Sequence, residues 1–218
     1  MSRLLFEKTK SAIYISHLDL MRVFQRAFRR AGYLLHHTEG FNQRAYVSLA
    51  LPLSVGTASV CEILEFVLDE PFSPQELRER LNRTLPEGIV VREVYESSLK
   101  FKFLRYLRAD VILEYDDGVP AQAAAQILAL LQRPALPVTK HGKKGDTEVD
   151  LAPMLFSAAA LQQDAQTLQL QVLVSAQNPS LNPMQLAQAI AQYLPDCKPD
   201  FAFCRRQEVL TAEKTPFR

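Results

Sequence analysis

The sequence predicts an α+β protein with antiparallel sheets, because the order β-α-β-β-α-β can be read twice along its 218 residues. The length fits one large domain or two small ones of about 100 residues each. A hydrophobic content of 48% is sufficient for a core. We therefore predict two tandem ferredoxin-like βαββαβ units: a basic half at 1–98 and an acidic half at 109–218, with a connecting basic and aromatic segment at 99–108.

The first half is predicted to begin with a β-rich opening that runs through 12–15 and stops at Ser16. A helix at 17–31 is predicted to follow. Ser16 is the predicted N-cap, with Asp19 three residues later as in a capping box. Gly32 is the predicted C-terminal cap. The apolar residues of this helix recur at helical spacing and predict a buried stripe: Leu20, Val23, Phe24, Ala27, Phe28 and Ala31.

The second helix of this half has the clearest start signal in the chain. Ser73, Pro74 and Glu76 supply an N-cap, a first-position proline and a capping box. The helix is expected to end near Leu85. Strands complete the half at 45–50, 60–68 and 89–95.

The second half repeats this order of elements. Asn182, Pro183 and Gln185 open its last helix with another N-cap, first-position proline and capping residue. The other predicted elements are strands at 109–115, 168–172 and 201–210, a helix at 120–132 and a β-rich stretch at 137–156.

Charge is unevenly distributed, although the net charge is only +1. Residues 1–108 carry 16 Lys and Arg against 12 Asp and Glu, a net charge of +4. The remainder carries 9 against 12, a net charge of −3. The basic half is therefore the better candidate for contact with a polyanion.

Cysteine content and hydropathy disfavour several classes of protein. Cys61, Cys197 and Cys204 are too few for a disulfide framework, and their spacing matches no common zinc or iron–sulfur site. Cys61 lies in an apolar strand and is expected in the core. No apolar run approaches the roughly 18 residues that cross a bilayer, and the first residues lack a signal-peptide hydrophobic region. We expect a cytoplasmic protein with no membrane association, no metal site and no cofactor.

The helix at 17–31 carries four arginines away from its apolar stripe: Arg22, Arg26, Arg29 and Arg30. Three of them step by four residues and stack along one face, where like charges repel one another. A solvated helix face explains this pattern, and a bound polyanion would neutralise it. We predict these four arginines to be nucleic-acid-binding residues.

The segment at 100–108 alternates basic and aromatic residues. Lys100, Lys102 and Arg105 would contact phosphates while the aromatic rings stack on bases. An amphipathic strand with its two phenylalanines inward explains the same spacing. In a third basic cluster, at 140–145, two glycines would let the backbone approach phosphate oxygens. We favour the alternative, an exposed hairpin turn.

Candidate catalytic residues are few. His17, at the start of the first predicted helix, is the one candidate for a general acid or base. His36 and His37 are adjacent in the sequence, so they do not easily converge as ligands. The common nucleophile, metalloprotease and dinucleotide-binding motifs do not occur in the sequence.

Short motifs are spread along nearly the whole chain: ISHLDLMR at 15–22, GFN at 40–42 and LPLSVG at 51–56. Together with 81–88 and 144–151, they resemble a bacterial family of radical SAM-associated proteins of unknown function. Members of that family occur alone or fused behind a radical SAM domain, so the resemblance implies a radical SAM enzyme as partner. The motif residues that it marks are Ser16, Asp19, Gly40, Phe41 and Asn42.

The chain departs from the family pattern directly after Asn42. Gln43-Arg44 stands where the family usually has Pro-His, so a role that rests on that histidine does not carry over. The chain also lacks the three-cysteine C-x₃-C-x₂-C motif of radical SAM enzymes. The resemblance therefore implies an accessory protein and not an enzyme by itself.

Three functions fit these observations. The first is an RNA-binding or substrate-presenting module that works beside a radical SAM enzyme. The second is a metal-independent RNA-processing endonuclease, by analogy with CRISPR RNA-processing endonucleases. In it, His17 would be the acid/base and Arg22 or Arg26 the phosphate clamp. The third is a protein scaffold without nucleic acid.

Overall fold

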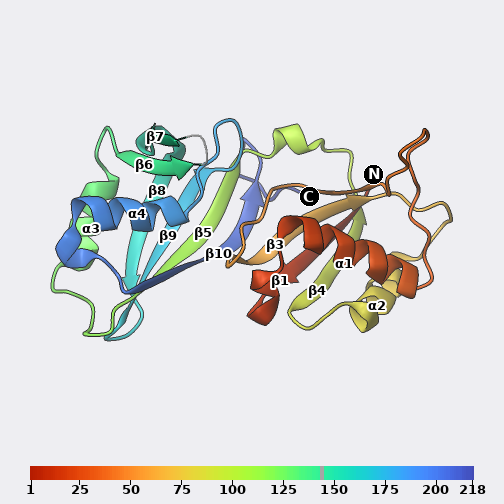
Figure 1. The fold of residues 1–218 in the computed structure, drawn as a ribbon, viewed down its shortest axis with the longest axis horizontal. Coiled ribbons are helices and arrows are strands. Elements are labelled where there is room, and N and C mark those ends of the chain that lie inside the picture. Colours follow the sequence, from red (N-terminus) through yellow and green to blue (C-terminus); the bar gives the residue numbers. More distant parts are fainter. Residues whose placement is uncertain (143–144) are drawn as a thin grey trace. The chain divides into compact units, whose positions relative to one another are not determined.

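The computed structural model describes residues 1–142 and 145–218, which form two compact units (Figure 1). Met1–Phe103 together with Arg218 make up the first unit, and Leu104–Phe217 make up the second. Each unit combines two helices with an antiparallel sheet, so the predicted α+β class is confirmed. Among the described residues, no helix is both long and apolar enough to cross a membrane.

The first unit contains β1 (Ser2–Lys8), α1 (His17–Arg30), β2 (Val47–Leu49), β3 (Ala58–Phe66), α2 (Pro74–Thr84) and β4 (Ile89–Glu96). β1 pairs antiparallel with β3 and with β4, and β2 pairs antiparallel with β3. The strand order is therefore β4-β1-β3-β2. Both helices cover the same face of this sheet (Figure 1).

The core of the first unit lies between its sheet and its helices. Phe6 of β1 meets Phe24 of α1 edge to face, with ring centroids 4.7 Å apart. Phe28 of α1 meets Phe66 of β3 at 5.0 Å. All four rings are buried, and each stabilises the fold by about 1.5–3 kcal/mol. They fix one side of α1 on the sheet and thereby direct its polar side outward.

The predicted start signals of α1 and α2 are confirmed. The Ser16 hydroxyl accepts a hydrogen bond from the backbone N–H of Asp19 at 3.2 Å. The Ser73 hydroxyl accepts one from the N–H of Glu76 at 3.5 Å. Each bond satisfies an amide that the first helical turn leaves without a partner.

The strand predicted at 12–15 is wrong. The first strand is β1, and Lys10–Tyr14 form a 3₁₀ turn. The Thr9 N–H donates to the Gly88 carbonyl at 2.7 Å, and Lys8 Nζ donates to the Ile13 carbonyl at 2.8 Å. These bonds hold the chain in a turn directly after β1.

The strand alternation considered for 100–108 is also wrong. Phe101–Phe103 form a 3₁₀ turn, and the next strand begins only at Tyr106. Phe103 is largely exposed and not inward.

Arg3 of β1 explains why this segment leaves the strand path. Its buried guanidinium donates to Glu65 at 3.1 and 3.0 Å, to the Ser97 hydroxyl at 2.9 Å and to the Leu99 carbonyl. It also lies 4.8 Å from the ring centroid of Phe101. Arg3 therefore fastens the end of the first unit to its own sheet.

The second unit contains β5 (Tyr106–Glu114), α3 (Ala123–Leu131), β6 (Pro137–Gly142), β7 (Gly145–Asp150), β8 (Leu155–Gln162), β9 (Thr167–Ser175), α4 (Met184–Tyr193) and β10 (Phe201–Leu210). β5 pairs antiparallel with β9 and β10, and β8 pairs antiparallel with β9. The order is therefore β10-β5-β9-β8. β6 and β7 form a separate hairpin.

The β-rich stretch predicted at 137–156 divides into this hairpin and the start of β8. Asp150 Oδ1 accepts hydrogen bonds from the N–H groups of Leu136 at 2.7 Å and Ala152 at 3.1 Å, which close the base of the hairpin. The last strand is confirmed at its predicted bounds. Cys61 is buried in β3, as predicted.

Candidate nucleic-acid interface

A cleft of about 490 Å³ lies beside the C-terminal half of α1 in the first unit. One wall comes from α1, and another comes from the connection between α1 and β2. We call it the arginine cleft. The described residues that line it include Arg26, Arg29, Tyr33, Leu34, His37 and Asp69.

Arg26 and Arg29 reach this cleft because of the helix period. Ala27 and Phe28 lie on the buried side of α1. Arg26 precedes this pair and Arg29 follows it, so both arginines point away from the core. Both arginines are exposed. They are three positions apart in the sequence, which places them on neighbouring turns of one helix face.

The other two predicted arginines of α1 have different partners. Arg22 Nη1 donates to Asp19 Oδ1 at 2.8 Å. Arg30 Nη2 donates to the Thr84 carbonyl at 2.6 Å, at the end of α2. Of the four arginines, the structure therefore brings Arg26 and Arg29 together in the cleft.

Tyr33 enters the cleft wall through the C-terminal cap of α1. Gly32 has a φ of +85°, and the Tyr33 N–H donates to the Phe28 carbonyl at 3.0 Å, as in a Schellman motif. The Arg80 guanidinium lies 5.7 Å from the Tyr33 ring centroid. Burial, with a smaller effect of Glu76, raises the pKa of Tyr33, so its hydroxyl stays neutral at neutral pH.

Two histidines fix the polar groups of the opposite wall. His36 Nδ1 lies 2.7 Å from Asp69 Oδ1, so this carboxylate already has a partner. His37 Nδ1 lies 2.8 Å from the Leu35 carbonyl. Because a carbonyl only accepts, Nδ1 of His37 carries the proton and Nε2 is left to face other groups.

The arrangement suits the binding of an anionic ligand. Guanidinium groups bind phosphates with two parallel hydrogen bonds. Two of them lie beside a tyrosine ring and the exposed side chain of Leu34. Phosphate contacts and contacts with a base or sugar would therefore lie within one cleft.

His17 lies apart from the arginine cleft. It is the first residue of α1 and lies nine positions before Arg26, which is about 14 Å along the helix axis. His17 is not among the residues that line the cleft, so the geometry of the cleft gives no support to its predicted acid/base role. Its Nδ1 is buried and, within the described residues, has no hydrogen-bond partner.

The other predicted basic residues lie on separate segments. Lys100 and Lys102 are exposed at the end of the first unit, and the ammonium of Lys102 lies 5.2 Å from the centroid of the Phe103 ring. Arg105 is exposed in the second unit. In the basic cluster at 140–145, residues 143 and 144 lie outside the described part of the chain.

The motif residues fall into two groups. Ser16 and Asp19 cap α1, and the Ser16 hydroxyl also donates to Asp19 Oδ2 at 2.7 Å. Gly40, Phe41 and Asn42 are exposed on the loop between α1 and β2. The first group is therefore structural, whereas the second lies on the surface.

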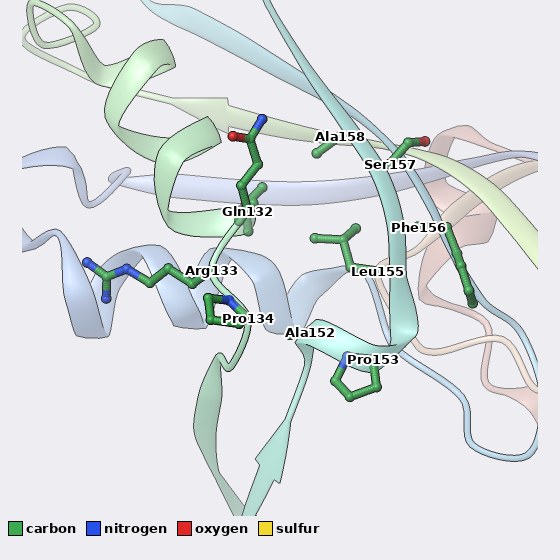
Figure 2. A pocket seen from close by; sticks show the side chains of 10 residues that line it. Gln132, Arg133, Pro134, Ala152, Pro153, Leu155, Phe156, Ser157 and Ala158 are labelled. Atoms are coloured by element: carbon green, nitrogen blue, oxygen red, sulfur yellow. The ribbon is translucent and has the colours of Figure 1, made fainter.

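A second cleft, of about 530 Å³, lies in the second unit between the end of α3 and β8 (Figure 2). Leu155 points from β8 toward the side of the cleft where Gln132 and Pro134 lie, whereas Phe156 points to the other side of β8. Arg133 extends away from β8, and its guanidinium lies 5.5 Å from the ring centroid of Tyr193. Apart from Arg133, the residues that line this cleft are uncharged.

Sequence reasoning missed Tyr33, Leu34 and Asp69 as parts of the site. The position of Tyr33 directly after the capping Gly32 is the sequence feature that could have placed it at the C-terminal end of α1, beside the arginines. Asp69 follows β3 and is far from α1 in the sequence, so only the folded chain brings it to the cleft. In residues 1–142 and 145–218, no group of three or more His, Cys, Asp or Glu side chains could hold a metal ion.

The fold and the cleft define a mixed α+β protein with mainly antiparallel sheets and a basic cleft on one helix. A family profile matches residues 2–183, and the chain belongs to this family, described as "Uncharacterized protein conserved in bacteria (DUF2344)". A comparison with curated proteins finds no match.

Among solved structures, the chain is similar to a chain of the "Crystal Structure of a Cbf5-Nop10-Gar1 Complex", with a TM-score of 0.52 and 7% identity. It is also similar to a chain of the "Crystal structure of the archaeal box H/ACA sRNP Nop10-Cbf5 complex", with a TM-score of 0.44 and 8% identity. The matches cover 95% and 94% of this chain but only 48% and 46% of those chains. At such low identity, the first likeness concerns the fold alone.

Proposed function

We propose that this protein binds single-stranded RNA through the arginine cleft. The observation that carries the proposal is the placement of Arg26 and Arg29 beside Tyr33 in one open cleft. Cationic side chains that follow a phosphate backbone, with an aromatic ring nearby, are typical of single-strand binding sites. Asp69, the acidic residue of the cleft, is engaged by His36 and opposes an anion less than a free carboxylate would.

The same proposal includes a radical SAM enzyme as partner. It is motivated by the motifs at 15–22 and 40–42, which resemble a radical SAM-associated family, and by the missing cluster cysteines. In this role the protein holds an RNA for modification by the partner, in the cytoplasm. The partner should be recovered by pull-down after co-expression, and failure to recover it under mild salt would remove this part of the proposal.

We also propose that each unit is a ferredoxin-like domain. The support is the strand order, which is β4-β1-β3-β2 in the first unit and β10-β5-β9-β8 in the second. Counted along each unit without the β6–β7 hairpin, both orders are fourth, first, third, second. The hairpin is then an insertion in the second domain.

Binding of a labelled single-stranded RNA, followed by fluorescence anisotropy, tests the arginine cleft. The Arg26→Glu/Arg29→Glu variant should lose about tenfold or more in affinity at 0.1 M salt. The matched control is Arg78→Glu/Arg83→Glu, which makes the same charge change on α2, where both arginines line other clefts. Thermal melting checks that both variants are folded.

Two outcomes would contradict the proposal. If the wild-type protein binds no RNA at low salt, the RNA-binding function is wrong, and the protein scaffold without nucleic acid is the remaining candidate function. Equal losses in the cleft variant and the α2 variant would indicate a nonspecific effect of charge.

A further inference from the structure

The connection between α1 and β2 forms a narrow loop that projects from the first unit (Figure 1). The Thr38 N–H donates to the Arg44 carbonyl at 2.9 Å, and the Arg44 N–H donates to the Thr38 hydroxyl at 3.1 Å. One step further down, His37 and Ala45 form an antiparallel bridge. The loop is therefore closed at its base, and residues 39–43 form its tip.

Phe41 at this tip is fully exposed. The preceding Gly40 has a φ of +115°, which side chains other than glycine rarely adopt, and a Cβ there would meet nothing within 4 Å. Backbone conformation, not packing, therefore calls for glycine at this position. A large aromatic ring held in water on a shaped loop has the features of a binding residue.

The loop and the arginine cleft share a wall. His37 and Ala45, which pair at the base of the loop, both line the cleft. Phe41 is four residues beyond His37, so the two lie at most about 14 Å apart. A short stretch of one strand can therefore reach from the cleft to the tip.

We propose that Phe41 stacks on an unpaired base of an RNA strand whose phosphates lie in the arginine cleft. This inference rests on the proposed function and names its ligand more closely: a single strand with an accessible base, not a duplex. Stacking on an aromatic ring is open to every base, so sequence preference should be weak. The loop then acts as the base-contacting part and α1 as the phosphate-contacting part of one site.

Charge favours an RNA over an apolar protein segment as the occupant. Arg26 and Arg29 line the cleft, and Arg44 is exposed at the base of the loop. On the acidic side, Glu39 lies on the loop and Asp69 is engaged by His36. The surface around Phe41 thus presents more cationic than acidic side chains to a ligand.

The test compares Phe41→Ala with wild type on two labelled oligonucleotides, a single-stranded RNA and its abasic counterpart with the same phosphates. Phe41→Ala should weaken binding of the base-containing RNA by about 5- to 150-fold, the range for loss of one stacked base. Binding of the abasic strand should be unchanged by the substitution. Tyr14→Ala, which removes another exposed aromatic ring of the first unit, is the matched control and should have no effect.

Phe41→Trp gives an independent measurement. The chain has no tryptophan, so this variant carries a single indole at the loop tip. It should retain RNA affinity, and its fluorescence should be quenched by the base-containing RNA but not by the abasic strand.

The outcomes separate this inference from the proposed function. If wild type binds RNA but Phe41→Ala binds both strands as wild type does, the stacking inference is overturned and the arginine cleft stands. If wild type binds no RNA, the proposed function fails with it. If Phe41→Ala instead abolishes recovery of a partner enzyme and leaves RNA affinity unchanged, the loop is a protein-binding element and the inference is wrong.

Discussion

The Arg22 guanidinium donates a hydrogen bond to the Asp19 carboxylate at 2.8 Å, one turn away on α1. This ion pair neutralises the first arginine of the row and leaves Arg26 and Arg29 to face the cleft. The row of equally spaced arginines is therefore not one uniform surface. Arg22 pairs within the helix, and Arg30 donates to the Thr84 carbonyl at the end of α2. Arg26 is the member of the row that lines the cleft, together with the neighbouring Arg29.

Asp19 should make the first unit sensitive to acid. The hydrogen bond from Ser16, followed by that from Arg22, holds the pKa of Asp19 below its ordinary 3.8. Because the folded pKa is the lower one, the stabilisation is present above about pH 4 and is lost as the pH falls through the folded pKa. Asp19→Asn should thus lower the melting temperature at pH 6 and have little effect near pH 2. A pH-independent difference in melting temperature would contradict this assignment.

Gly88→Ala should destabilise the first unit strongly. The residue has a φ of +86°, and a Cβ there would lie 2.3 Å from the Thr9 carbonyl oxygen and 2.9 Å from Ala12 Cβ. Backbone strain and the clash together should lower the free energy of unfolding by at least about 2 kcal/mol. Urea unfolding measures the change.

Gly56→Ala is the control for backbone strain alone. Gly56 also has a positive φ, +82°, but a Cβ there meets nothing within 4 Å. Gly56→Ala should lower the free energy of unfolding by only about 1–2 kcal/mol, the penalty for a residue with a side chain in the left-handed conformation. If both substitutions lower the free energy of unfolding equally, the clash with the Thr9 carbonyl does not contribute to the destabilisation at Gly88.

Arg3→Met should be among the most destabilising single substitutions in the first unit. It leaves Glu65 and the Ser97 hydroxyl without the guanidinium that they contact. Loss of one partner of a buried charge pair lowers the free energy of unfolding by about 3–5 kcal/mol. Because Glu65 is partly exposed, we expect a value near the lower end of this range. The same substitution at Lys10, whose pair with Glu87 is at 2.7 Å but exposed, should cause no measurable loss.

Local signals in the sequence predicted the elements that local contacts determine. The N-caps at Ser16 and Ser73 act within one turn of their own helix, so a sequence pattern is enough to find them. The strand predicted at 12–15 failed because long-range bonds decide that region. Thr9 contacts Gly88, and nothing in the alternation near Thr9 indicates this partner.

The candidate site was predictable in part for the same reason. The arginines of α1 share one helix, so their common face follows from the helix period. Arg22 pairs with Asp19, whereas Arg26 and Arg29 line the cleft, and the helix period alone does not predict this difference. Asp69 comes from another part of the chain, and only the folded unit brings it beside Arg26.

The salt dependence of RNA binding tests the central claim most directly. For single strands, log Kobs should fall with log salt with a slope of roughly −0.7 per phosphate contact. Arg26→Glu/Arg29→Glu removes two such contacts and should make the slope less steep by about 1.4, whereas Arg78→Glu/Arg83→Glu should leave it as in wild type. An unchanged slope in the cleft variant, or a change of equal size in the α2 variant, would contradict the assignment of RNA binding to the arginine cleft.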